Sequence, residues 1–85
     1  MQKKAIGNLP GGAGVYLFKK GARILYIGRA TSLKNRVASY FRNDLLETRG
    51  TRLVDMVALS EKVDFFETES VLEAIILEAN LIKKH

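Results

Sequence analysis

The chain has 85 residues, no cysteine and a formal net charge of +5 at pH 7. Its length allows one small domain with a modest core, and its apolar fraction of 47% excludes a disordered tail. Without cysteine, disulfides and thiolate metal sites are excluded, and the positive charge favours a polyanionic partner, nucleic acid first. A basic surface without a partner is the alternative that charge alone leaves open.

No export or membrane signal is recognisable in the sequence. The segment 1–5 is basic, but no apolar run of about 7–15 residues follows it. Nothing approaches the ~20 consecutive apolar residues of a membrane-spanning helix. We therefore expect a cytoplasmic protein with no membrane partner.

The first predicted elements are two strands joined by a tight turn. After the turn-forming segment 9–12, residues 15–19 and 24–27 are β-favouring apolar runs, joined by the tight connection Lys20-Gly21-Ala22. This hairpin contains Tyr16 and Tyr26. A three-residue loop would place the two tyrosines opposite each other on one face, and a two- or four-residue loop would place them on opposite faces.

Two helices are predicted to follow the hairpin. Thr31 or Ser32 can cap the first, in which Leu33, Val37, Tyr40 and Phe41 share one face. The second is expected over about 48–59, where Leu53, Met56 and Val57 have helical spacing. Gly50 lies near the start of this helix and leaves its first residue undetermined.

A third strand over 62–68 and a final helix complete the chain. Ser70 and Glu73 form a capping box at the start of that helix. An apolar stripe behind it is predicted to face the core: Leu72, Ile75, Ile76, Ala79 and Ile82. The order β-β-α-α-β-α predicts an α/β protein of the α+β type, a small three-stranded sheet flanked by helices.

Glu78 is the most notable acidic residue. It lies at the edge of the predicted stripe, and its helical neighbours Ala74, Ile75 and Ile82 cannot pair with it. A carboxylate in such a place needs a partner or a metal ion. From spacing alone, the better explanation is a salt bridge to an arginine of another element.

Arg36, Tyr16 and Tyr26 each have a structural and a chemical interpretation. Arg36 flanks the buried face of the first helix, where it could hold a phosphate or cover the core with its stem. The tyrosines could be core aromatics. A phenol titrates near pH 10, so it activates water at neutral pH only if cations such as Arg29 and Arg36 lower its pKa.

Other chemistry lacks the residues that it needs. The one histidine, His85, leaves a serine triad without a base and zinc without ligands, and no phosphate-binding glycine loop is present. Tyrosines, arginines and one helical carboxylate suit phosphodiester hydrolysis assisted by a hard cation. Magnesium takes only one or two protein carboxylates together with water and substrate phosphate.

The arrangement resembles the GIY-YIG nuclease family over about residues 10–85. The motifs that carry the resemblance occur in the family's order: Gly14-Val15-Tyr16, Tyr26-Ile27-Gly28, residues 33–37 followed by Ser39-Tyr40-Phe41, and Thr68-Glu69-Ser70 leading into residues 77–84. Two tripeptides alone would be a weak signal. Four ordered blocks across the whole domain are a strong one.

The resemblance implies a three-stranded antiparallel sheet and an endonuclease that cleaves a DNA strand with Mg²⁺ or Mn²⁺. It implies that Tyr16 and Tyr26 line the site, one as general base or water-positioning group. It also implies that Arg36 holds the scissile phosphate and that Glu78 binds the metal. Arg29 replaces a lysine that is usual after the second motif, and it keeps the charge but is a poor base. The residues expected to contact DNA are Gly28, Lys34, Asn35 and Arg42.

The motifs are most similar to those of one branch of this family, the N-terminal domain of the incision protein of the bacterial excinuclease. For that branch the resemblance implies the 3′ incision in nucleotide excision repair, a place in the SOS response to DNA damage, and the damage-recognition subunits as partners. The family continues beyond the glutamate helix into a Pro-x-Tyr-Asn-like segment, so residues 1–85 are expected to be one nuclease domain, the N-terminal part of a longer protein. A stand-alone structure-selective nuclease and a non-cleaving nucleic-acid-binding module of the same fold are the alternatives.

Overall fold

A three-stranded antiparallel sheet lies at the centre of the computed structural model, which describes residues 7–85. The strands are β1 (Gly14–Lys20), β2 (Arg23–Ala30) and β3 (Lys62–Glu67), in the order β2-β1-β3. β1 is therefore the central strand, and β2 and β3 are the edges. The basic segment 1–5, which the search for an export signal considered, lies outside the described residues.

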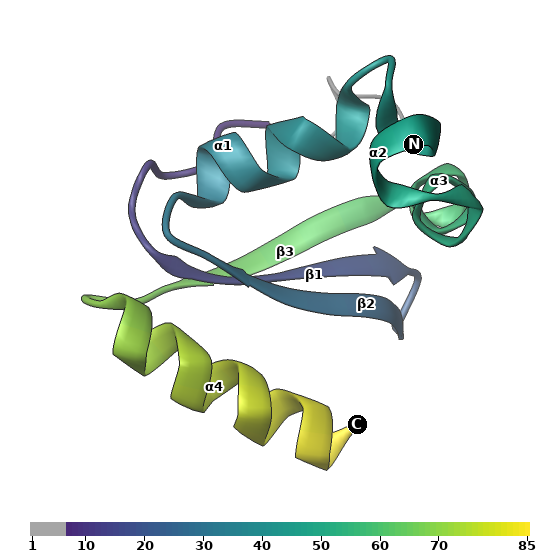
Figure 1. Cartoon of the computed structure of the whole chain (residues 1–85). Helices are drawn as coiled ribbons and strands as arrows, with labels where there is room; N and C mark the ends of the chain where they lie inside the picture. The colour runs from purple at the N-terminus through teal and green to yellow at the C-terminus, as the bar shows by residue number, and fades with distance from the viewer. Residues whose placement is uncertain (1–6) are drawn as a thin grey trace.

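Helices cover both faces of this sheet (Figure 1). One face carries α1 (Leu33–Ala38), the 3₁₀ helix η2 (Ser39–Phe41), α2 (Leu45–Arg49) and α3 (Thr51–Leu59). The other carries α4 (Val71–Lys84) alone. The predicted fold class is confirmed. Over residues 7–85, no helix has both the length and the apolar character needed to cross a membrane.

Each of the two helices predicted in the middle of the chain is divided in two. The first tightens into η2 after Ala38, where the Ser39 hydroxyl donates to the carbonyl of Arg36. The second begins at Leu45 and is interrupted at Gly50, whose φ of +84° is in the left-handed region that favours glycine. This interruption turns the chain between α2 and α3.

The start of α1 is anchored to the loop before β1. Ser32 is the N-cap, and its hydroxyl accepts from the backbone N–H of Asn35 at 3.3 Å. The N–H groups of Leu33 and Lys34 donate to the carbonyls of Gly12 and Pro10 at 2.9 and 3.0 Å. Two of the helix's unpaired donors are thereby satisfied, and α1 is fixed beside the end of β2.

The hairpin register differs from both predicted alternatives. Lys20 pairs with Arg23 across a two-residue turn, but a bulge at Leu25 shifts the register, so that Phe18 pairs with Tyr26. Tyr16 consequently pairs with Gly28. The two tyrosines lie on one face as diagonal neighbours, because the bulge reverses the change of face that a two-residue loop alone would cause.

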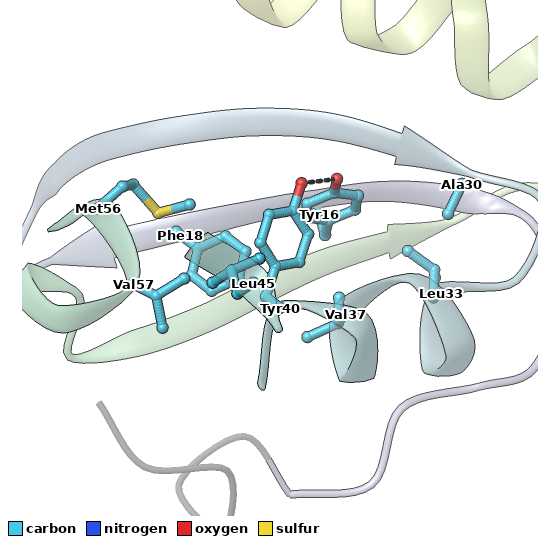
Figure 2. Close-up of a cluster of buried hydrophobic side chains, with 9 residues drawn as sticks. All are labelled: Tyr16, Phe18, Ala30, Leu33, Val37, Tyr40, Leu45, Met56 and Val57. Carbon is cyan, nitrogen blue, oxygen red and sulfur yellow. Dashed lines mark hydrogen bonds between the residues drawn. The ribbon is translucent and has the colours of Figure 1, made fainter. Parts of the chain in front are cut away.

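Two hydrophobic clusters hold the layers together. The larger lies between the sheet and α1–α3, and Figure 2 shows Tyr16, Phe18 and Tyr40 at its centre. The smaller lies under α4 and contains only three buried residues: Val15, Leu17 and Ala74. Ser70 caps α4 by accepting from the N–H of Glu73 at 3.1 Å, which confirms the predicted start of this helix.

The predicted core stripe of α4 is wrong. Leu72 and Ile76 are 66% and 55% exposed, and Ile75, Ala79 and Ile82 are exposed as well. The residues that pack on the sheet are instead Ala74, Leu77 and Leu81. Apolar residues lie on two faces of α4, one exposed and one packed on the sheet, so helical spacing alone did not indicate which face is buried. The small Ala74 lets the backbone of α4 approach β1 closely.

Candidate active site

The site predicted from the sequence lies at the edge strand β2, where it leads into α1. Tyr16 belongs to the central strand, yet its ring extends over Gly28 of β2. A Cβ atom built at Gly28 would lie 2.4 Å from the Tyr16 hydroxyl oxygen, so any side chain there would displace the ring. Gly28 is buried, and its first role is to make room for Tyr16. Its expected contact with DNA remains a prediction.

Three tyrosines gather at this place. The hydroxyls of Tyr16 and Tyr40 lie 2.6 Å apart and share a hydrogen bond, which Figure 2 shows as a dashed line. The ring centroid of Tyr26 lies 6.4 Å from that of Tyr16 and 6.3 Å from that of Tyr40. The structure thus brings together the two predicted tyrosines and adds a third.

Sequence reasoning did not select Tyr40 as a site residue. Helical spacing placed it on the core face, and it is 1% exposed, so that prediction is confirmed. A second signal was available, because a buried tyrosine hydroxyl usually needs a hydrogen-bond partner. A search for that partner would have led from Tyr40 to Tyr16.

Arg36 lies beside this cluster, as predicted. Its guanidinium carbon is 5.9 Å from the centre of the Tyr40 ring, and interaction with the Tyr16 hydroxyl raises the pKa of Arg36. The side chain is exposed overall, so it can also reach a ligand from solvent. A permanently charged, forked donor in this position suits a phosphate group.

The condition that neighbouring cations lower the phenol pKa below its ordinary value is not met for Tyr26. Burial raises the pKa of Tyr26, and the neighbouring Tyr40 raises it further, while Arg49 and Arg36 lower it only in part. The pKa of Tyr40 is likewise raised, chiefly by burial. Arg29 does not contribute to either shift, because it points to the opposite face of the sheet.

Glu78 and Arg29 form the second half of the site. Nη1 of Arg29 donates to Oε1 of Glu78 at 2.6 Å, and the side chains are 50% and 16% exposed. Glu78 follows Ala74 by one helical turn, so it lies on the side of α4 that packs against the sheet. The salt bridge to an arginine of another element is therefore present.

The surroundings of Glu78 also fit a hard cation. The guanidinium of Arg29 is a positive group in contact with its carboxylate, and it stands where a metal ion could bind. Among residues 7–85, no group of three or more His, Cys, Asp or Glu side chains could hold a metal. A cation here would rely on one protein carboxylate and complete its shell with water and phosphate, which Mg²⁺ accepts readily.

A cavity of about 410 Å³ is lined by one arginine from each half of the site, Arg29 and Arg36. Its lining runs from Arg29 through the segment between β2 and α1 to Asn35, Arg36 and Ser39. It is open to solvent and carries positive charge at both ends, so it can admit a phosphodiester from outside. Arg29, which pairs with α4 on one face of the sheet, and Arg36, which belongs to α1 on the other face, therefore line the same opening.

The predicted DNA contacts are only partly brought together. Asn35 lines the cavity, whereas Lys34 and Arg42 do not. Arg42 is paired with Asp44, with Nε 3.0 Å from Oδ1. Lys34 is exposed on α1, where it could meet a longer ligand. Contact of these residues with DNA remains a prediction.

Comparison with known proteins gives a consistent result. The model of the UvrC-like GIY-YIG domain matches residues 12–85. Relatives named UvrABC system protein C include those of Fusobacterium nucleatum, 44% identical over 92% of this chain, and Thermus thermophilus, 41% identical over 100% of it. The chain spans 13% of the length of each of these two relatives.

The structural matches agree. The N-terminal GIY-YIG endonuclease domain of UvrC from Thermotoga maritima, bound to magnesium as its catalytic divalent cation, has a TM-score of 0.80 and 34% identity, covering 99% of this chain and 92% of that one. An asparagine-to-alanine variant of it, also bound to its catalytic cation, has a TM-score of 0.82 and 34% identity, covering 99% and 91%. The tyrosine cluster, the paired arginine and glutamate and these matches identify the chain as a member of the UvrC-like GIY-YIG endonuclease domain family.

Proposed function

We propose that this chain cleaves one strand of DNA by hydrolysis of a phosphodiester bond, with Mg²⁺ held at Glu78. The observation that carries the proposal is the cavity lined by both Arg29, which pairs with Glu78, and Arg36, which lies beside the tyrosine cluster. A phosphate bound there would have guanidinium groups on two sides. One carboxylate would remain for the cation.

The roles of the side chains follow from their positions. Arg36 would hold the scissile phosphate through its forked N–H groups and stabilise the charge that grows on it. The hydroxyl oxygen of Tyr16 or Tyr26 would orient the attacking water or take its proton. Arg29 would contact the phosphate after leaving Glu78, and Asn35 would donate from the cavity wall. The remaining predicted contacts, by Gly28, Lys34 and Arg42, would be made with the DNA on either side of this phosphate.

The cation supplies charge stabilisation at the phosphate and lowers the pKa of water that it binds. Glu78 would hold it, and this is the only described carboxylate in contact with the cationic wall of the cavity. Mn²⁺ could replace Mg²⁺, since both accept oxygen ligands. The related domain from Thermotoga maritima binds magnesium as its catalytic cation, and Mg²⁺ is accordingly the first ion to test here.

The wider role is proposed from the relatives. Proteins named UvrABC system protein C match almost the whole of this chain, which spans about one seventh of their length. We infer that residues 1–85 act as the N-terminal nuclease domain of such a longer protein in the cytoplasm. In that setting the domain would make the 3′ incision of nucleotide excision repair together with damage-recognition subunits. A stand-alone structure-selective nuclease is the alternative.

Nicking of supercoiled plasmid in Mg²⁺ tests the proposed function. We expect the wild-type chain to nick the plasmid and Glu78→Ala to lose nicking by a factor of about 10³ or more, because the cation loses its protein ligand. Glu73→Ala is the matched control, since Glu73 is an exposed carboxylate on the same helix.

The outcomes separate the candidate functions. Nicking by Glu78→Ala at the wild-type rate would disprove the role of this carboxylate. Salt-dependent DNA binding by the wild-type chain without nicking in Mg²⁺ or Mn²⁺ would favour the non-cleaving binding module. Repeating both assays with a full-length relative would then determine whether the isolated domain lacks a required segment.

A further inference from the structure

Arg49 of α2 contacts the tyrosine cluster, as Arg36 of α1 does. It is the last residue of α2, directly before the left-handed Gly50 that turns the chain into α3. Its guanidinium carbon lies 4.8 Å from the centre of the Tyr40 ring, and its Nη2 donates to the Tyr40 hydroxyl at 3.2 Å. The proposed function assigns this residue no role.

These contacts favour one direction for the hydrogen bond between Tyr40 and Tyr16. A guanidinium can only donate, so the Tyr40 oxygen accepts from Arg49. The hydroxyl proton of Tyr40 then has the Tyr16 oxygen, 2.6 Å away, as its acceptor. This assignment leaves neither hydroxyl unsatisfied, in agreement with the absence of unpaired buried side-chain polar atoms among residues 7–85.

We propose that Arg49 is a positioning residue for the nuclease reaction: it keeps the Tyr40 hydroxyl as a donor to Tyr16 and places a second positive charge against the tyrosine cluster. The proposal rests on the proposed function, in which a tyrosine of this cluster acts on the attacking water. Arg49 itself touches neither the cavity that contains Arg36 nor the Glu78 carboxylate.

The charged and titratable groups around the cluster can all be named. Tyr16 and Tyr26 face it from the hairpin, Arg36 from α1 and Arg49 from α2. Arg52 of α3 lines a neighbouring cavity of about 430 Å³ together with Tyr26 and Arg49. Among the described residues, no acidic side chain lines that cavity. His85 lines a separate cavity of about 340 Å³ with Tyr26.

The direction of the effect follows from this arrangement. Burial raises the pKa of both Tyr40 and Tyr26, and Arg49 lowers the pKa of each. The charge of Arg49 lowers the pKa of Tyr26 more than the charge of Arg36 does. Removal of Arg49 should therefore raise both phenol pKa values further. Any step that needs a phenolate would then move to higher pH.

A competing explanation is that Arg49 and Arg52 together bind a DNA phosphate in the 430 Å³ cavity. Arg52 is the matched control, because it lines the same cavity but has no described hydrogen bond or ion pair with a tyrosine. A phosphate-binding pair would make the two arginines equivalent. A positioning role makes them different.

The first test needs no substrate. All three tyrosines of the chain belong to the cluster and the chain has no tryptophan, so phenolate absorbance in the ultraviolet reports this cluster alone. We expect Arg49→Met to raise the first ionisation midpoint by about one pH unit, Arg49→Lys to raise it less, and Arg52→Met to leave it unchanged. Circular dichroism would establish that each variant is folded.

The second test is the pH dependence of plasmid nicking in Mg²⁺. We expect the acidic limb for Arg49→Met to move up by about one unit, which reduces kcat roughly tenfold at neutral pH, with KM for DNA within about twofold of the wild-type value. Arg49→Lys should shift the limb by less than Arg49→Met does. Equal effects of Arg49→Met and Arg52→Met on KM, with unchanged pH profiles and ionisation midpoints, would overturn the proposal.

Failure of the proposed function would be recognised separately. If the wild-type chain does not nick DNA, the nuclease role fails, while the ultraviolet titration still decides whether Arg49 acts on the tyrosines. If Arg49→Met does not fold, Arg49→Gln provides the same comparison, because glutamine also removes the positive charge but keeps a polar side chain. An unchanged titration midpoint for Arg49→Gln together with an unchanged pH profile and rate would then count against the positioning role.

Discussion

The two faces of the sheet differ in how firmly they hold their part of the site. On the face covered by α1–α3, Tyr16, Phe18, Leu33 and Val37 are no more than 1% exposed, so the tyrosine half of the site is part of the main core. On the other face, α4 packs on a smaller cluster with three buried and four partly buried residues, and much of its apolar surface remains exposed.

This difference separates stability from chemistry. A change in the tyrosine half should affect folding and catalysis together, because the same rings fill the core and line the site. A change at Glu78 or Arg29 should affect the reaction and leave the fold nearly unchanged. The domain thus combines a buried aromatic half with a carboxylate on a helix that has fewer buried contacts.

The largest effect is expected from Gly28→Ala. The new Cβ would lie 2.4 Å from the Tyr16 ring, and the ring is held by the core, so it cannot simply rotate away. We expect a loss of about 1–3 kcal/mol in the free energy of unfolding, together with loss of nicking. Chemical denaturation measures the first and the plasmid assay the second.

Gly11→Ala is the control for this variant, because a Cβ at Gly11 meets nothing within 4 Å. It should unfold like the wild-type chain. A stable and active Gly28→Ala variant would mean that the tyrosine face is more adaptable than its burial indicates.

A smaller effect is expected on the α4 face. Leu77→Ala should destabilise the domain by about 1–2 kcal/mol, because Leu77 is half-buried against Val15 and Leu17. Leu72→Ala, one of the residues of the wrongly predicted stripe, should change the free energy of unfolding by less than about 0.5 kcal/mol. Urea titration of both variants makes the comparison.

The reverse order would show a different packing of α4. If Leu72→Ala were the more damaging change, the stripe predicted from periodicity would be the face that α4 buries in solution. The smaller number of buried contacts of this helix would then need a new explanation.

Arg29→Gln tests whether the guanidinium competes with the cation for Glu78. Because the pair is partly exposed, its contribution is small, and we expect the affinity for Mg²⁺ to rise by a factor of about five or less. Isothermal titration calorimetry without DNA measures this affinity. Arg23→Gln, an exposed arginine of the same strand, controls for the general loss of charge.

A lower affinity in Arg29→Gln than in Arg23→Gln would contradict this expectation. In that case Arg29 would organise Glu78 for the cation instead of occupying it. The plasmid assay should still record reduced nicking, since Arg29 also lines the cavity.

The smallest effect concerns the pair of Lys19 and Asp64, whose Nζ and Oδ2 atoms are 2.8 Å apart. The hydrogen bond from Lys19 lowers the pKa of Asp64. The pair therefore stabilises the folded state above the ordinary aspartate pKa, and this stabilisation disappears as the pH falls through the lowered value. Asp64→Asn should flatten the acid limb of stability slightly.

Urea unfolding between neutral and acidic pH would measure this effect. Asp55→Asn is the control, because no ion pair described for residues 7–85 involves Asp55. Equal acid limbs for the two variants would show that the exposed pair contributes nothing measurable.

Much of the fold could be predicted from local signals. Ser32 and Ser70 cap helices through hydroxyls that accept backbone N–H bonds, and such caps are readable in a sequence. The bulge at Leu25 could not be predicted, because it depends on how Leu25 and Tyr26 both pack toward the larger cluster. The buried face of α4 could not be predicted either. It is centred on Ala74, a small residue that hydrophobic spacing does not distinguish from the larger apolar residues around it.

The candidate site was predictable only in part. Tyr16, Tyr26, Arg36 and Glu78 were selected as candidates through motifs, but the contact of Arg29 with Glu78 joins residues far apart in the chain. Arg49 has no local signal at all. Its contact with Tyr40 depends on the turn at Gly50. In the sequence, Gly50 indicated only that the start of the second helix was not well defined.

The bulge at Leu25 also bears on how this hairpin could change its length. Side chains alternate between the faces, so one residue added to the two-residue turn would exchange the faces of everything that follows it, sending Tyr26 toward α4 and Arg29 toward the tyrosines. Removal of the bulged residue would preserve the pairing of Phe18 with Tyr26. The two tyrosines therefore stay on one face only if the number of residues between them changes by an even number, or if a single added or lost residue is compensated at the bulge.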